Sequence, residues 1–288
     1  MSDPARILDQ GYRRYDEERG TVIDAMRTVT LFSLGRVLGL RRGFWPKVLP
    51  ITTIVISFLP AVVFVGMAAL LPDPFEEGLP TYGEYYGFVT AAIIIFTAFV
   101  GPELLCPDRR NRMIGLYLAS PLDRMTYLAA KGVAVIIALS IVTIGPPLLL
   151  LVANTIEGSG PDTISDFLDL LWRILLAGIV IAAVHTSLSL AVSSFTDRNG
   201  FASAAVILIL LLSSAVSGSI VDGAGGSDAL RAIDLFSLPF ELVTRIFGDI
   251  ETTWPEVSTG FLVAANLFWT ALFTGVVIWR YRRLEVTR

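Results

Sequence analysis

The chain has 288 residues and a formal net charge of −4, and 54% of its residues are hydrophobic while only 17% are charged. Soluble domains usually carry charge on about a quarter of their residues, so this composition argues against a soluble protein and indicates a membrane protein. A single cysteine, Cys106, excludes an intramolecular disulfide, and one cysteine with one histidine, His185, cannot build an ordinary zinc site.

The N-terminal 46 residues precede the first strongly apolar run. Residues 1–20 are polar and predict a poorly ordered tail. Residues 21–46 predict an amphipathic helix in the membrane interface, with Arg27 towards anionic headgroups. Its apolar face comprises Val22, Met26, Val29, Val37 and Leu40. Arg36 falls on the same face, so a small helical cap that packs on protein is an alternative interpretation.

The segment 47–281 predicts a transmembrane domain with six helical spans. A helix needs about 20 apolar residues to cross a hydrocarbon layer of about 30 Å. The six runs that qualify are roughly 48–71, 87–105, 132–153, 174–193, 201–221 and 260–279. Pro60 and the Gly145-Pro146-Pro147 triplet lie inside two of them and predict kinks, which neighbouring helices in a bundle can accommodate. The expected fold class is therefore all-α and integral to the membrane.

Lys and Arg gather on one side of these spans. Nine lie in the N-terminal segment, five in the 102–131 loop, one in the 194–200 turn and four in the C-terminal tail, which makes 19 of the 22 basic residues. Because cytoplasmic segments are enriched in Lys and Arg, both termini are expected in the cytoplasm, including a short tail at 282–288. Only two of the basic residues are Lys, a bias that favours a bacterial origin.

The 222–259 loop is then external. Its 229–250 part is rich in apolar residues, and Pro239 is expected to divide it into two short helices before the last span. These helices either dip part-way into the outer leaflet or form a cap packed on protein, since both environments accept apolar surface.

The spans carry almost no charge, which argues against an ion-coupled transporter. His185 is the one ionisable residue deep in a span, and beside Thr186 and Ser187 it is more typical of a hydrogen bond between packed helices than of a proton relay. The sequence has no G-x-x-x-x-G-K-[ST] loop, so it lacks that device for holding ATP phosphates. The sequence shows no catalytic constellation, and an enzyme is not predicted.

The 102–131 loop combines basic and apolar residues. Asp108 is placed to cap a helix that begins at Arg109, and Ser120-Pro121 would end this helix. Its exposed set would be Arg109, Arg110, Arg112, Met113, Leu116 and Tyr117. The enrichment of cytoplasmic loops in basic residues explains the arginines, so an ordinary loop is an alternative. It does not explain the apolar side chains between them, which favour a socket on a partner protein.

At this loop the sequence resembles the ABC-2 type permease family, whose members are membrane subunits of ABC exporters. The resemblance rests on Pro102-Glu103, Asp108-Arg109-Arg110, Leu116-Tyr117-Leu118, Ser120-Pro121-Leu122, Arg124, Tyr127 and Lys131. The interfacial helix, the six spans and the short helices before the last span are similar to the family in layout only. The resemblance implies a coupling helix near 109–118 that docks on a separate ATPase through Asp108 and the exposed set. Asp197 and Arg198 in the 194–200 turn are a second candidate contact.

The resemblance also implies the partners and the compartment. The chain would form half of a dimeric permease in the bacterial cytoplasmic membrane, together with a second copy or a paralogue. ATP and Mg would bind the partner ATPase, this chain would hold no cofactor or metal, and its other contacts would be membrane lipid rather than nucleic acid. Export is implied by the family alone, and the residues do not identify the substrate. A membrane scaffold or assembly protein without transport activity is the alternative function.

Overall fold

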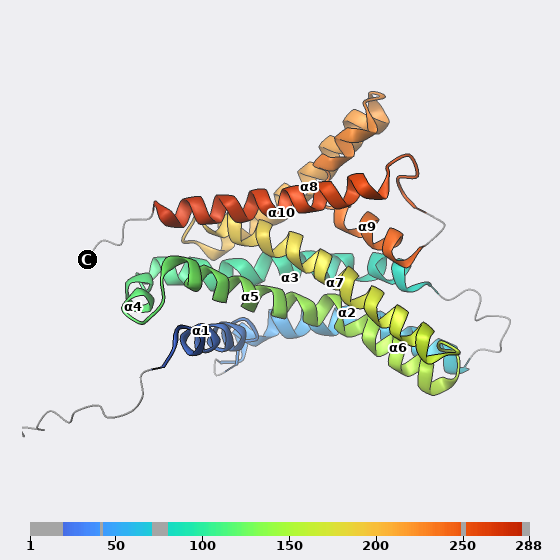
Figure 1. Ribbon diagram of the computed structural model, residues 1–288, viewed down its shortest axis with the longest axis horizontal. Coiled ribbons are helices and arrows are strands. Elements are labelled where there is room, and N and C mark those ends of the chain that lie inside the picture. Colours follow the sequence, from blue (N-terminus) through green and yellow to red (C-terminus); the bar gives the residue numbers. More distant parts are fainter. Residues whose placement is uncertain (1–19, 41–42, 71–79, 249–251, 284–288) are drawn as a thin grey trace, which may run out of the picture.

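The computed structural model describes residues 20–40, 43–70, 80–248 and 252–283. These residues form helices and turns and no strand (Figure 1). Among them, six helices are long and apolar enough to cross a membrane, as judged by length and composition. The predicted all-α fold with six spans is confirmed. The tails predicted at 1–20 and 282–288 fall almost entirely outside the described residues.

The helices that form the spans are α2 (Trp45–Leu70), α3 (Tyr82–Arg110), α5 (Arg124–Thr143) continued by α6 (Gly145–Glu157), α7 (Ile164–Ser193), α8 (Asn199–Gly218) and α10 (Thr259–Arg282). Each span begins before the apolar run that predicts it, and α3, α6 and α10 also end after it. Polar residues that cap the helices account for part of this added length. At α3, Thr81 and Glu84 each accept a hydrogen bond from the other's backbone N–H, and Asp123 and Thr126 do the same at α5.

α3 lies in the middle of the bundle. It packs against α2, α5, α7 and α8. In its most apolar stretch 72% of the residues are buried, compared with 22% in α2, α8 and α10. The latter three helices are therefore peripheral, and in Figure 1 α8 projects away from the others. Residues at the ends of α3 are consequently placed by contacts with most of the other spans.

The kink predicted at the Gly-Pro-Pro triplet separates α5 from α6. In a continuous helix the carbonyl of Thr143 would accept the backbone N–H of residue 147, but Pro147 has none. Tyr86 on α3 supplies a replacement, because its hydroxyl donates a 2.9 Å hydrogen bond to the Thr143 carbonyl oxygen. The break is thus satisfied inside the bundle, which is the condition under which a span tolerates proline.

α1 (Val22–Val37) begins with a capping box between Thr21 and Asp24. It packs on α5 and α3, and Val29 and Val37 are buried there. Part of the predicted apolar face therefore contacts protein, while Val22 and Leu40 of the same face are exposed. The placement of α1 in the membrane interface stays a prediction. The large apolar side chains that α1 leaves exposed include Ile23, Leu31 and Phe32.

The described residues of the 222–259 loop form a cap at the opposite end of the bundle from α1 (Figure 1). A 3-10 helix over Asp228–Ile233 precedes α9 (Leu238–Phe247). Pro239 does not divide a helix but lies in the first turn of α9, where its missing N–H costs no hydrogen bond. α9 buries Leu238, Leu242 and Val243 against the spans, so the cap packs on protein.

Candidate functional site

The residues predicted to contact a partner lie at the end of the bundle that holds α1 and the end of α10 (Figure 1). The predicted helix beginning at Arg109 is not formed. α3 continues to Arg110, the chain turns at 111–113 with Arg112 in the left-handed region (φ 53°), and α4 covers only Ile114–Leu118. The predicted cap at Asp108 was wrong, because this residue is buried in the last turns of α3 and its carboxylate binds side chains instead.

Asp108 holds three partners from two other helices. Its Oδ1 lies 2.8 Å from Arg36 Nη1 on α1, and its Oδ2 lies 2.8 Å from Lys131 Nζ on α5. The hydroxyl of Tyr127, also on α5, donates a 2.8 Å hydrogen bond to Oδ2. We call Arg36, Asp108, Tyr127 and Lys131 the Asp108 cluster. It fixes the end of α3 to both α1 and α5.

Glu103 extends this cluster to α8. Its Oε1 lies 3.4 Å from Arg36 Nε, and its Oε2 accepts a 2.9 Å hydrogen bond from Asn199 Nδ2 at the start of α8. Two buried carboxylates therefore face the cations of Arg36 and Lys131. A buried charge without a partner costs several kcal/mol, and this balance of charge offsets that cost.

Tyr117 attaches α4 to the Asp108 cluster. Its ring centroid lies 5.2 Å from that of Tyr127 and 5.5 Å from Lys131 Nζ. Tyr127 in turn lies 6.2 Å, centroid to centroid, from Tyr281 at the end of α10. Burial raises the pKa of Tyr117 and the nearby Asp108 carboxylate raises it further, so the hydroxyl is neutral at physiological pH. A row of aromatic rings thus connects α4 to α5 and α10.

The other predicted residues of this segment face outward to different degrees. Arg110 and Arg112 are exposed, Met113 is half-buried, and 71% of Leu116 is exposed. Leu116 and Tyr117 are neighbours in α4, but Leu116 is uncovered while Tyr117 packs on the cluster. α4 therefore has an outer side with an apolar side chain near arginines and an inner side attached to the bundle.

The 194–200 turn lies beside this segment. The guanidinium of Arg109 donates hydrogen bonds to the carbonyl oxygens of Ser194 and Thr196. Asp197 and Arg198 in the same turn are exposed. The structure therefore brings the two predicted contact segments together on one end of the bundle.

The sequence alone does not assign Arg36, Tyr127 or Lys131 to the site. Tyr127 and Lys131 belong to the residues that carry the family resemblance, and Arg36 is a charge on an otherwise apolar face. That misplaced charge was a usable signal, because a charge on a buried face requires a partner. The partner could not be identified without the fold, since Arg36 and Asp108 are 72 residues apart in the sequence.

His185 lies outside this site. Its Nδ1 is 2.8 Å from the carbonyl oxygen of Ile181 in its own helix, and its ring meets the ring of Phe240 on α9 edge-on. Within the described part of the chain, no group of three or more His, Cys, Asp or Glu side chains is arranged to hold a metal ion.

Comparison with protein families decides what this architecture is. A family model described as ABC-2 family transporter protein matches residues 65–279, from the end of α2 to the end of α10. The chain belongs to the ABC-2 transporter family. It is thus the membrane domain of an ABC transporter, which has a permease role and lacks the ATPase. The resemblance seen in the sequence is confirmed.

Membership of the ABC-2 family implies an ABC ATPase as partner. α1 and most of α2 precede the matched range, so the family match does not extend to Arg36. A comparison with curated proteins found no match.

Proposed function

We propose that the chain is the permease subunit of an ATP-driven exporter and that its ATPase docks on α4 and the 194–200 turn. The observation that carries this proposal is the two-sided character of α4. An element that transmits force between subunits has to be exposed to its partner and attached to the moving bundle. Leu116 meets the first condition, and Tyr117 meets the second.

The exposed surface around α4 has the chemistry of a small protein interface. Leu116 would enter an apolar pocket of the ATPase, and anchors of this kind often cost at least about 2 kcal/mol when truncated. Arg110, Arg112 and the turn residues Asp197 and Arg198 would lie at the rim. Charges at an exposed rim are screened by salt, so we expect Leu116 to set the affinity and the arginines to set its salt dependence.

The contacts of the Asp108 cluster supply a route for motion into the spans. A push on α4 would move Tyr117, whose ring packs on Tyr127 of α5. Asp108 would carry the same displacement to α3, because its ion pairs hold α3 to α5 and to α1. Closure of the ATPases would then tilt several helices together rather than bend one loop. The outward direction of transport in this proposal is taken from the family.

A second copy or a paralogue would complete the transport path. The peripheral helices α2 and α8 leave much of their apolar surface uncovered, including Leu208, Leu211 and Leu212 on α8. The distribution of basic residues supports an orientation with both termini in the cytoplasm of a bacterial cell.

Docking on α4 is tested by the variant Leu116→Ala, with the full-length permease co-expressed with the ATPase encoded by an adjacent gene. Loss of an anchor worth about 2 kcal/mol should weaken retention of the ATPase roughly 30-fold. The matched control is Leu168→Ala on α7, an exposed leucine at the opposite end of the bundle. Equal retention by both variants would move the docking site away from α4, and absence of any ATPase partner would favour a scaffold.

A further inference from the structure

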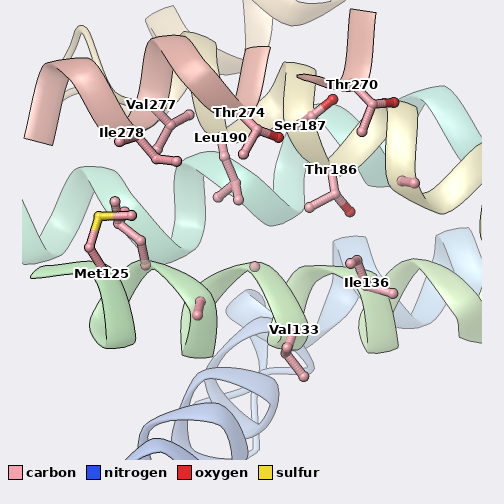
Figure 2. A pocket seen from close by; sticks show the side chains of 14 residues that line it. Met125, Val133, Ile136, Thr186, Ser187, Leu190, Thr270, Thr274, Val277 and Ile278 are labelled. Carbon is pink, nitrogen blue, oxygen red and sulfur yellow. The ribbon is translucent and has the colours of Figure 1, made fainter. Parts of the chain in front are cut away.

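A cleft of about 360 Å³ lies between α5, α7 and α10 (Figure 2), on the turns of α5 that also carry Tyr127 and Lys131. Its walls are apolar apart from a few hydroxyl groups, and they include Leu128, Ile136, Leu190 and Val277. Val133 and Thr274 also line the cleft and are exposed. The cleft therefore opens sideways, where a bundle in a membrane meets lipid.

The cleft has the length of one leaflet. On α5 its lining residues run from Met125 to Ile136, eleven positions apart, which corresponds to about 16 Å of helix. The hydrocarbon layer of a bilayer is about 30 Å thick, so one leaflet accounts for about 15 Å. Because Met125 is the second residue of α5, the cleft begins at the basic end of the bundle.

One buried polar atom that lines the cleft has no hydrogen-bond partner among the described residues. Thr186 on α7 is 5% exposed, and its Oγ1 makes no hydrogen bond among the described residues. Another lining threonine, Thr270, donates to the carbonyl oxygen of Asn266 in its own helix. Figure 2 shows Thr186 directed into the space between α7 and α5. In Figure 2 Thr186 lies nearer to Ile136 than to Met125, so its hydroxyl faces the deep part of the cleft rather than its mouth.

The mouth of the cleft is positively charged. Arg124 comes directly before the first lining residue of α5, and its Nη1 donates a 2.8 Å hydrogen bond to the carbonyl oxygen of Arg282, which joins two walls of the cleft. The side chains of Arg282 and Arg283 are exposed just beyond the last lining residue of α10. The neighbouring Asp123 caps α5, and its carboxylate accepts hydrogen bonds from the backbone N–H and the hydroxyl of Thr126.

We propose that this cleft binds one acyl chain of an anionic phospholipid, whose phosphate lies against Arg124, Arg282 and Arg283. The apolar groove, which is as long as one leaflet, matches the acyl chain of such a lipid. The basic mouth matches its anionic headgroup, which lies at the membrane surface. Basic residues at a membrane surface attract anionic headgroups. The lipid site is independent of ATPase docking on α4 and stands even if that docking lies elsewhere.

Native mass spectrometry of the full-length protein in detergent tests this site. Phosphatidylglycerol and phosphatidylcholine are added separately at equal concentration, and bound lipid is counted as activating energy is raised. We expect one phosphatidylglycerol to survive delipidation while phosphatidylcholine is lost. Gly132→Leu should abolish this retention, because residue 132 lines the cleft and an added Cβ meets only Leu190 at 4.0 Å, which leaves the rest of the side chain to fill the groove. Ala129→Leu fills the same groove from an exposed position and is the second variant if Gly132→Leu folds poorly.

The matched control for both is Gly87→Leu on α3, where no atom lies within 4 Å of an added Cβ. For the headgroup, Arg282→Gln and Arg283→Gln should each weaken phosphatidylglycerol retention about fivefold, whereas Arg27→Gln on α1 should not. Retention that survives both filling variants, equal loss in Gly87→Leu, or equal binding of the two lipids would overturn the proposal. Cross-linking of a second copy through the cleft would also overturn it.

Discussion

Lys131 Nζ on α5 lies 2.8 Å from Asp108 Oδ2 on α3, and neither side chain is exposed. These two helices flank α4 in the sequence, one before it and one after it. The ion pair therefore joins the two ends of the segment that contains α4. It fixes α3 to α5, while α4 lies on the outside of this contact. Because Tyr117 packs against both Lys131 and Tyr127, α4 cannot be displaced without disturbing that contact.

Removal of the buried cation should destabilise the whole bundle. Lys131→Met leaves the Asp108 carboxylate buried with Arg36 and Tyr127 as its remaining partners. Breaking one side of a buried ion pair costs about 3–5 kcal/mol, and the surviving partners should keep the loss of stability at the low end, about 3 kcal/mol. Thermal unfolding of the purified protein in detergent measures this loss of stability. Lys47→Met, at the half-buried lysine near the start of α2, is the matched control.

The same ion pair predicts that the losses of stability caused by Asp108→Asn and by Lys131→Met will not be additive. In the double variant Asp108→Asn with Lys131→Met, both charges of the pair are gone, and Arg36 retains Glu103 as a partner. The double variant should therefore lose clearly less stability than the sum of the two single variants, since residues in contact are coupled. Strictly additive losses would show that the pair does not act as a unit.

Tyr117 should transmit force rather than bind the ATPase. Tyr117→Ala removes the ring contact with Tyr127 and the contact with Lys131, while Leu116 stays exposed. Aromatic pairs contribute about 0.5–1.5 kcal/mol beyond burial, so we expect ATP turnover of the complex to change about twofold to tenfold while the ATPase is still retained. Tyr117→Phe keeps the ring and should behave as wild type. If Tyr117→Ala instead releases the ATPase and leaves the turnover of bound complexes unchanged, Tyr117 is an anchor.

The spans were predictable because an apolar run of sufficient length can be recognised from its own residues, without knowledge of the rest of the fold. Each helix needs its own 20 or so apolar residues whatever its neighbours are, so the fold class follows from the sequence alone. The ends of the helices were less predictable, because residues such as Thr81 and Asp123 extend them by capping bonds that hydropathy does not report.

The error at Asp108 has a different cause. An Asp before a basic and apolar segment matches the local pattern of a helix cap, and the cap would be correct if nothing else bound the carboxylate. Here Arg36 and Lys131 bind it, and both are remote in sequence. Ion pairs between residues far apart in the sequence thus override a local helix-capping preference, and the pair with Arg36 holds α1 against α3.

Close packing of α3 on α7 depends on Gly101. A Cβ at this position would collide with the Ser189 hydroxyl and would lie 2.9 Å from the Ser189 carbonyl carbon, which is backbone and cannot turn away. Gly101→Ala should therefore lower stability by about 1–3 kcal/mol through overpacking. Gly87→Ala on the same helix meets no atom within 4 Å and should leave the unfolding midpoint unchanged or slightly higher. Equal midpoints for the two variants would show that the helices separate without cost.

The basic end of the bundle should face the cytoplasm, which thiol labelling in intact cells can test. Single cysteines are placed at Gly20, Ala224 and Arg283, all exposed positions, in a Cys106→Ser background. Cys106 is itself buried and should react slowly even when present. Because Lys and Arg concentrate in segments that stay in the cytoplasm, an impermeant reagent should label position 224 only, and permeabilised cells should label all three. Labelling of positions 20 and 283 without 224 would invert the orientation, and it would place α4 where no cytoplasmic ATPase can reach it.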